Sequence, residues 1–192
     1  MKNLFRLTVS LSLILAGLVT FSRPLAGQGT APSRTGVMGE LLEDIGGAEK
    51  KIVALANAMP ESAYAWRPQA GVRSVGEVFQ HIASDNYFLP VLLGKMPPKE
   101  TGITKDDKTA EAFEKRPMNK AAVVAELEKS FAFLRTSMNA TTDAQLDTAI
   151  DMFGEKSTAR GLWINAATHM HEHLGQLIAY ARSNKVTPPW SK

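Results

Sequence analysis

Hydrophobic residues recur at helical spacing along most of the chain and predict long amphipathic helices. The apolar positions repeat three and four residues apart in four stretches, at residues 37–59, 75–89, 119–139 and 159–183. Ser74 is followed three residues later by Glu77, which is the signature of a capping box at the start of the second stretch. Pro90 is expected to bend that helix or to end it. Four such helices without a convincing strand predict an all-α four-helix bundle.

The segments between the predicted helices are polar. Residues 94–118 form a long polar connection between the second and third helices, in which residues 109–115 could make a short helix. Residues 148–158 contain Phe153-Gly154-Glu155, which is typical of a small hairpin or of an extended loop.

The first residues have the layout of a secretory signal peptide. Lys2 and Arg6 precede an apolar run at residues 7–21, and small residues near Ala26 offer a cleavage site. The run is shorter than the roughly 20 residues that a membrane-spanning helix needs. An uncleaved N-terminal anchor is the alternative. We expect export to the periplasm or the cell exterior, no stable membrane span after cleavage, and this organisation: signal peptide 1–26, linker 27–36, bundle domain 37–186 and extended tail 187–192.

Removal of the signal peptide changes the charge balance. The full chain has 22 Lys and Arg against 19 Asp and Glu, and three of the cations but none of the acids lie within residues 1–26. A mature chain with 19 charges of each sign lacks the electrostatic attraction on which nucleic-acid binding depends, so no nucleic-acid partner is expected. The chain has no cysteine, which excludes a disulfide, a thiolate nucleophile, a thiolate zinc site and a cysteine-linked lipid anchor.

The four histidines lie in two places, His81 in the second predicted helix and His169, His171 and His173 in the fourth. His169 and His173 are four residues apart and share one face of a helix, whereas His171 projects to nearly the opposite side and is expected to be solvated. His81 is then the remaining candidate for a third ligand. Three neutral imidazoles suit zinc, nickel, iron or copper, and three protein ligands leave a coordination position open, as in catalytic sites.

Two carboxylates share the His81 side of the second helix. Glu77 is explained by the capping box, so Asp85 is the candidate catalytic residue, acting as a base or as a hydrogen-bond partner of a ligand. A solvated surface acid is the alternative role for Asp85. Gln176 and Tyr180 lie on the histidine side of the fourth helix and could line a pocket.

Two motifs are more specific, Val72-Arg73-Ser74-Val75-Gly76-Glu77-Val78-Phe79-Gln80-His81-Ile82-Ala83 and His169-Met170-His171-Glu172-His173-Leu174-Gly175-Gln176. Together with Trp66-Arg67-Pro68, they resemble the DinB-like (DinB/YfiT) superfamily over residues 37–183. The resemblance implies an up-down-down-up four-helix bundle, often a homodimer. It also implies a divalent metal, usually zinc or nickel, bound by His81, His169 and His173.

Three functions stay open at this point. The first is a metal-dependent hydrolase, in which a water on the metal attacks an unknown small molecule. The second is a thiol-dependent S-transferase or isomerase, because characterised relatives use low-molecular-weight thiols, although an exported protein would lack those cytosolic cosubstrates. The third is a non-enzymatic, stress-related bundle that only binds metal.

Overall fold

The structure is a computed structural model that describes residues 35–191. The predicted signal peptide and all but the last two residues of the predicted linker lie outside the described residues. The long helices are α1 (Val37–Ala58), α2 (Val75–Phe88), α4 (Lys120–Asn139) and α5 (Ala159–Ser183). The shorter elements, in which η marks a 3-10 helix, are η1 (Glu61–Ala63), η2 (Leu89–Leu93), η3 (Lys99–Thr101), α3 (Asp107–Glu114), η4 (Asp143–Gln145), β1 (Ala149–Met152) and β2 (Glu155–Thr158).

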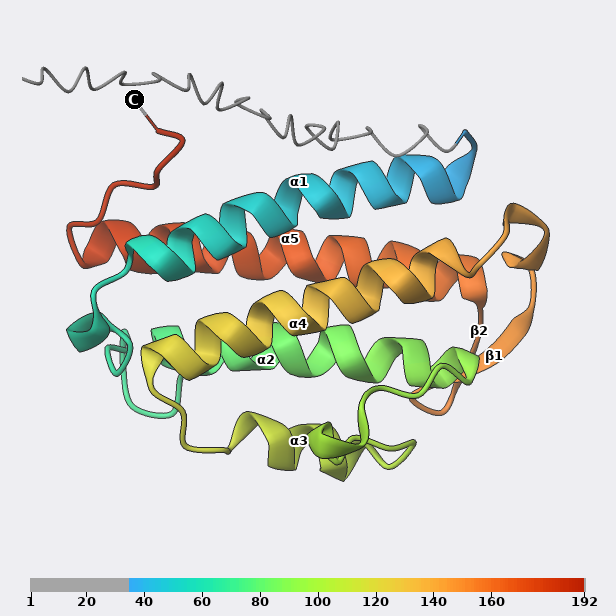
Figure 1. Cartoon of the computed structure of the whole chain (residues 1–192), viewed down its shortest axis with the longest axis horizontal. Coiled ribbons are helices and arrows are strands. Elements are labelled where there is room, and N and C mark those ends of the chain that lie inside the picture. Colours follow the sequence, from blue (N-terminus) through green and yellow to red (C-terminus); the bar gives the residue numbers. More distant parts are fainter. Residues whose placement is uncertain (1–34, 192) are drawn as a thin grey trace, which may run out of the picture. The chain divides into compact units, whose positions relative to one another are not determined.

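The four long helices form a bundle in which α1 packs on α4 and α5, and α2 packs on the same two helices. Following the colours of Figure 1, α1 and α5 run in one direction while α2 and α4 run in the other. The predicted up-down-down-up four-helix bundle is therefore confirmed. Because α2 and α4 are parallel, the chain must return along the bundle between them, and the polar connection at residues 94–118 does so.

The second helix begins and ends where the sequence predicts. The Ser74 hydroxyl accepts a hydrogen bond from the Glu77 amide at 3.3 Å, and the Glu77 carboxylate accepts one from the Ser74 amide at 2.6 Å. This reciprocal capping box satisfies two amides that an uncapped helix would leave free. The α-helix ends at Phe88, and Pro90 lies in the 3-10 turn that follows.

The polar connection carries the short helix α3, which begins two residues before the expected position and ends one residue before it. Phe113 on this helix is 1% exposed and meets the Tyr87 ring of α2 edge-on, with ring centroids 5.8 Å apart. The Ser84 hydroxyl of α2 donates to the Ala110 carbonyl at 3.0 Å. These contacts dock α3 against the outer side of α2.

Residues 149–158 form an antiparallel hairpin, so the hairpin was the right choice between the two structures considered for this segment. Ala149 pairs with Thr158 and Met152 with Glu155. Phe153 and Gly154 at the tip have φ values of 59° and 87°, as a two-residue hairpin turn requires. The absence of a convincing strand in the sequence is explained by length, because four-residue strands are too short to give a clear alternating pattern.

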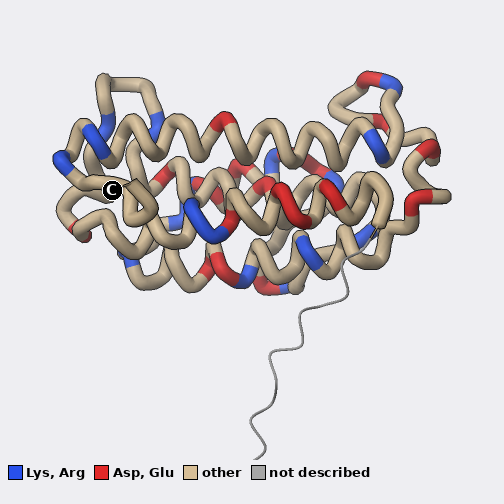
Figure 2. The backbone as a smooth tube through the Cα atoms, turned by 90° about the horizontal axis from the view of Figure 1, so that it is seen from above, with Lys and Arg blue, Asp and Glu red and all other residues tan. Residues whose placement is uncertain are grey.

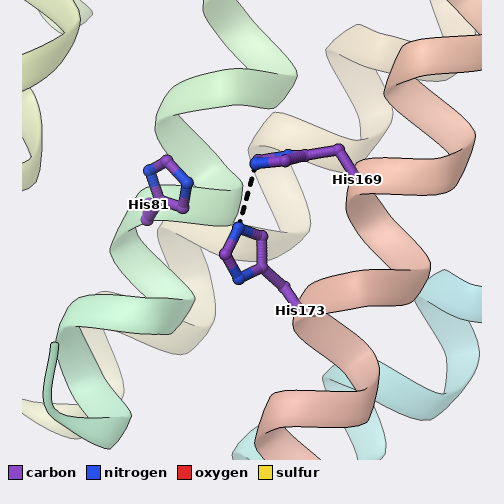
Figure 3. A group of neighbouring side chains, drawn as sticks. All are labelled: His81, His169 and His173. Atoms are coloured by element: carbon purple, nitrogen blue, oxygen red, sulfur yellow. Dashed lines mark hydrogen bonds between the residues drawn. The ribbon is translucent and has the colours of Figure 1, made fainter. Parts of the chain in front are cut away.

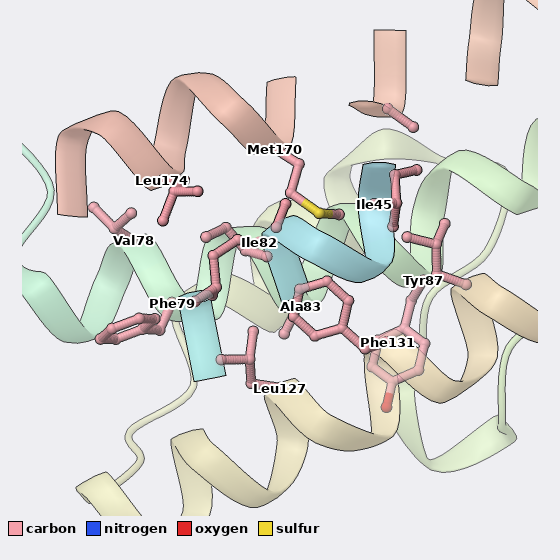
Figure 4. Close-up of a cluster of buried hydrophobic side chains, with 14 of the residues drawn as sticks. Ile45, Val78, Phe79, Ile82, Ala83, Tyr87, Leu127, Phe131, Met170 and Leu174 are labelled. Carbon is pink, nitrogen blue, oxygen red and sulfur yellow. The ribbon is translucent and has the colours of Figure 1, made fainter. Parts of the chain in front are cut away.

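The core lies between the four long helices and is apolar (Figure 4). Figure 4 shows Val78 and Ile82 of α2 beside Leu174 and Met170 of α5, whereas Phe79 points away from α5. Figure 2 shows basic and acidic residues interspersed along the helices. Residues 186–191 follow α5 without helix or strand. Within residues 35–191, every helix is too short or too polar to cross a lipid bilayer.

Candidate metal centre

Three imidazole rings converge between α2 and α5 (Figure 3). His81 comes from α2, and His169 and His173 come from successive turns of α5. The centroids of the two α5 rings are 4.3 Å apart, and the His81 centroid lies 5.2 Å from that of His169 and 4.6 Å from that of His173. One ring nitrogen from each histidine lies within 4.8 Å of the other two. The structure thus brings together the three histidines that the sequence places in one site.

The hydrogen-bond partners fix which nitrogen of His81 and of His173 is available to a metal. Nδ1 of His81 lies 2.6 Å from Oε1 of Glu114, a carboxylate oxygen that can only accept, so Nδ1 carries the proton. Nδ1 of His173 lies 2.9 Å from Oε1 of Gln176 and is a donor for the same reason. Nδ1 of His169 lies 3.3 Å from Oδ2 of Asp85. Nε2 of His81 and Nε2 of His173 then keep their lone pairs. Nε2 of His81 lies 3.3 Å from Oδ2 of Asp85, and the hydrogen bond between the Nε2 atoms of His173 and His169 holds a proton that a cation would replace.

The distances between these nitrogens show whether the residues fit a cation. The Nε2 atoms of His169 and His173 are 3.0 Å apart, and Figure 3 shows one nitrogen of His81 turned toward them. Two acceptor nitrogens at this distance repel each other unless a proton or a cation lies between them. Two nitrogens bound at 2.0–2.1 Å to one tetrahedral zinc ion lie about 3.3 Å apart. The donor set therefore fits a transition metal held by three imidazoles.

The environment favours the neutral forms of His169 and His173. Burial, together with the neighbouring His173 and His81, lowers the pKa of His169 to about 4. Burial also lowers the pKa of His173, against the opposing effect of its bond to Gln176. Neutral imidazoles do not have to lose a proton before they bind a metal near neutral pH.

Asp85 lies inside the site rather than on the open surface. Its Oδ2 is 3.3 Å from Nε2 of His81 and 3.3 Å from Nδ1 of His169, and its side chain is 22% exposed. Burial raises its pKa to about 6, although the nearby His81 and Arg73 act in the opposite direction. The alternative role of a solvated surface acid does not describe this position. A carboxylate beside the ring nitrogens can accept a proton or hold a ligand in place.

A narrow hollow with a volume of about 10 Å³, enough for about one water molecule, lies beside Asp85 and His169. Its other lining residues are mostly apolar, and they come from α2, η2 and α5: Ile82, Asn86, Leu89, Ala166 and Met170. A single water molecule would fit there, next to the Asp85 carboxylate.

Glu114 and Arg73 are parts of the site that sequence reasoning missed. Besides its contact with His81, Glu114 accepts hydrogen bonds at Oε2 from Nε and Nη2 of Arg73, at 3.3 and 3.0 Å. Burial raises the pKa of Glu114, but its bond to His81 and the Arg73 charge outweigh that effect and lower it. Glu114 is one acid among several in a polar connection, and only its place in an expected short helix set it apart.

Gln176 and Tyr180, which the sequence placed beside the site, link it to the loop before α2. The Gln176 amide donates to the Tyr180 hydroxyl at 3.0 Å, and that hydroxyl donates to the Arg73 carbonyl at 3.3 Å. Trp66 meets the Tyr180 ring edge-on, with centroids 5.2 Å apart. Starting from His173, these groups form one continuous chain of hydrogen bonds that ends at the backbone of Arg73.

Two other candidates lie outside the metal centre, as expected. Nε2 of His171 lies 2.9 Å from Oδ2 of Asp44 on α1, and both side chains are about half exposed. Glu77 caps α2 and pairs with Arg67 at 2.9 Å. The structure therefore separates His171 from the other two histidines of its cluster.

Comparisons with known proteins agree with the fold. A family model described as the DinB superfamily matches residues 46–177. The solved structure of a DinB-like protein from Bacillus cereus ATCC 10987 is 17% identical, with a TM-score of 0.67, and the match covers 81% of this chain and 97% of that one. A DinB-like protein from Bacillus subtilis is 20% identical, with a TM-score of 0.59, over 77% of this chain and 93% of that one. None of the curated proteins matches the chain.

Proposed function

This chain belongs to the DinB superfamily, and from that membership and the geometry of its site we propose that it is a metal-dependent enzyme. His81, His169 and His173 hold a divalent transition metal, zinc or nickel. The observation that carries the proposal is the convergence of three imidazoles, one nitrogen of each lying within 4.8 Å of the other two. In His81 and His173, Nδ1 is engaged by an accepting oxygen, so Nε2 is the nitrogen that faces the centre. Imidazole nitrogen suits zinc and nickel better than calcium or magnesium.

The proposed reaction is hydrolysis of a small molecule. A bound metal would supply Lewis acidity, which polarises a substrate oxygen or lowers the pKa of a coordinated water. Three protein ligands leave room for that extra ligand. Asp85 accepts the proton of the attacking water at Oδ2 and returns it to the leaving group, a task for which it lies beside two of the ligands. The hollow next to Asp85 has a volume of about 10 Å³, which is room for the attacking water.

Metal content tests the proposed site, and turnover then tests the proposed role of Asp85. The purified wild-type protein should contain about one zinc or nickel ion per chain, as should a His171→Ala control, whereas His81→Ala should contain neither. Asp85→Asn should keep the metal and lose about 10²-fold or more of its turnover on a panel of small esters and amides. Equal metal content in the wild type and His81→Ala would refute the site, and unchanged turnover in Asp85→Asn would refute the role of Asp85.

We also propose that the protein acts outside the cytoplasm, which the signal-peptide pattern of residues 1–26 supports. Cell fractionation of the full chain carrying a C-terminal tag tests this proposal. We expect a shortened protein in the periplasm or the medium, and a full-length protein confined to the cytoplasm would refute it. The homodimer stays a prediction, which the mass of the purified protein in solution decides.

A further inference from the structure

One side chain reaches the metal centre from outside the four long helices. Glu114 is the last residue of α3, and its Oε1 lies 2.6 Å from Nδ1 of His81. No other contact of His81, His169 or His173 among the described residues is as short. The contact is on the edge of the His81 ring that faces away from the other two histidines, so Glu114 approaches the ligand from behind.

The docking of α3 fixes where this carboxylate lies. The residue before it, Phe113, is buried against α2. On either side of it, the Ala110 carbonyl accepts from the Ser84 hydroxyl at 3.0 Å and the Arg116 carbonyl accepts from the Gln80 amide at 2.8 Å. Ser84 and Gln80 are close neighbours of His81 on α2. α2, which carries His81, therefore also holds α3 in place, and α3 supplies Glu114 as the partner of His81.

Arg73 connects the surroundings of two ligands. Its guanidinium holds Glu114, which in turn holds His81. Its carbonyl ends the chain of hydrogen bonds that starts at His173 and passes through Gln176 and Tyr180. Two ligands on different helices are thus braced, through separate partners, against one residue of the loop before α2.

We propose that Glu114 is the positioning residue of this metal centre, accepting the Nδ1 proton of His81 and thereby directing the Nε2 lone pair toward His169 and His173. Arg73 holds the carboxylate in place for that bond. This inference rests on the proposed function, because it presumes that Nε2 of His81 is a ligand. A carboxylate behind a ligating histidine fixes its tautomer and ring orientation, and losing such a partner typically weakens metal binding by 10- to 100-fold.

Zinc titration of the full chain tests the inference. Glu114→Ala should raise the dissociation constant for zinc by about 10- to 100-fold. Glu114→Gln keeps the side-chain size and an accepting oxygen but not the charge, so its effect should lie between those of the wild type and Glu114→Ala. The control is Glu111→Gln, which removes the same charge from an exposed position on α3 and should change the constant by less than about twofold.

Histidine nitrogen NMR supplies a readout that a purely structural role would not change. In the zinc-loaded wild type, His81 should carry its proton on Nδ1 and the metal on Nε2, and Glu114→Ala should lose the signature of a strongly hydrogen-bonded Nδ1 proton. Metal on Nδ1, or a change in affinity of less than about threefold in Glu114→Ala, would overturn the inference. An equal loss in Glu111→Gln would also overturn it, because a general charge effect would then explain the result.

The same spectra separate this inference from the proposed function. If the wild type binds neither zinc nor nickel, the proposed function fails, and the metal-free spectra still show whether Glu114 sets the tautomer of His81. In those spectra the wild type should have the Nδ1-protonated form, and Glu114→Ala, which removes the acceptor, should shift the population toward the other tautomer, with a smaller shift in Glu114→Gln. Unchanged tautomers in both metal-free variants would overturn the inference even if zinc binding were normal. Glu114→Gln also keeps the test available if Glu114→Ala does not fold.

Discussion

Two neighbouring histidines of α5 should differ in how much they contribute to stabilisation by zinc. His173→Ala should lose most of that stabilisation, and His171→Ala should keep it. His173 is 8% exposed and bonds to Gln176 and His169. His171, two residues earlier, makes a half-exposed pair with Asp44. Without metal, His173→Ala leaves polar groups unpaired and should cost about 1–3 kcal/mol of unfolding free energy. His171→Ala removes only a surface pair and should cost about 0–1 kcal/mol.

Zinc then separates the two variants more sharply. A ligand present at 100 times its dissociation constant stabilises the folded state by about 2.7 kcal/mol. Loss of a direct ligand should weaken binding at least as much as loss of an outer partner, by about 100-fold or more, which leaves about 0.4 kcal/mol at the same zinc concentration. At about 2–4 °C per kcal/mol for a domain of this size, zinc should raise the melting temperature by about 5–11 °C in the wild type and in His171→Ala. The rise in His173→Ala should be about 1 °C.

The assay is thermal unfolding followed by circular dichroism, with each variant measured in a chelator and again in excess zinc. The difference between the two conditions removes any effect of a substitution on the metal-free fold. A zinc-induced rise in His173→Ala as large as that of the wild type would refute the ligand assignment. Loss of the rise in His171→Ala would show that the outward histidine takes part, against the geometry of α5.

Three other predictions concern the surroundings of the site. Phe113→Ala should lower the unfolding free energy in urea by about 3–5 kcal/mol and weaken zinc binding, because the buried ring docks the helix that carries Glu114; unchanged zinc affinity would contradict this. Ser74→Ala removes the capping box of α2 and should cost about 1 kcal/mol, measured as a fall of about 2–4 °C in melting temperature; no change would mean that the cap contributes nothing. The metal-free protein should lose stability in urea as the pH falls from about 6.5 to about 4, because unfolding lets His169 regain an ordinary affinity for protons. Asp85, whose pKa is raised to about 6, acts in the opposite direction, so the loss should be steeper in Asp85→Asn, and a shallower loss there would refute this reasoning.

The helices could be predicted from the sequence because their signals are local. The apolar periodicity and the flanking polar residues place the start of α5 at Ala159 and its end at Ser183, which the structure confirms. The capping box of Ser74 is likewise readable from two residues. The hairpin at residues 149–158 could only be offered as one of two alternatives, because its strands are short and its stability depends on packing against the rest of the bundle.

Only the part of the candidate site that lies on a single helix could be predicted from the spacing of residues. A spacing of four residues places His169 and His173 on one face wherever the helix packs. His81 was already the remaining candidate for the third ligand, and the family resemblance implied the same residue. Its nearness to His169 and His173 depends on how α2 and α5 pack, which periodicity alone does not determine. Glu114 lies beside His81 because a short helix docks on α2 through contacts distant in sequence. No local pattern distinguishes that acid from Glu111 on the same helix, so sequence reasoning missed it.

The chain of hydrogen bonds that runs from His173 to Arg73 connects the metal centre to a tryptophan, whose fluorescence can be measured. When Nε2 of His173 is engaged, its Nδ1 must donate, which sets the direction of the Gln176 amide and then that of the Tyr180 hydroxyl. The indole of Trp66 lies edge-on against that phenol, so we expect a rearrangement that starts at His173 to change the surroundings of this indole. Metal binding should then alter the tryptophan emission of the wild type, and Trp66→Phe should lose that change, in a chain to which no dye needs to be attached.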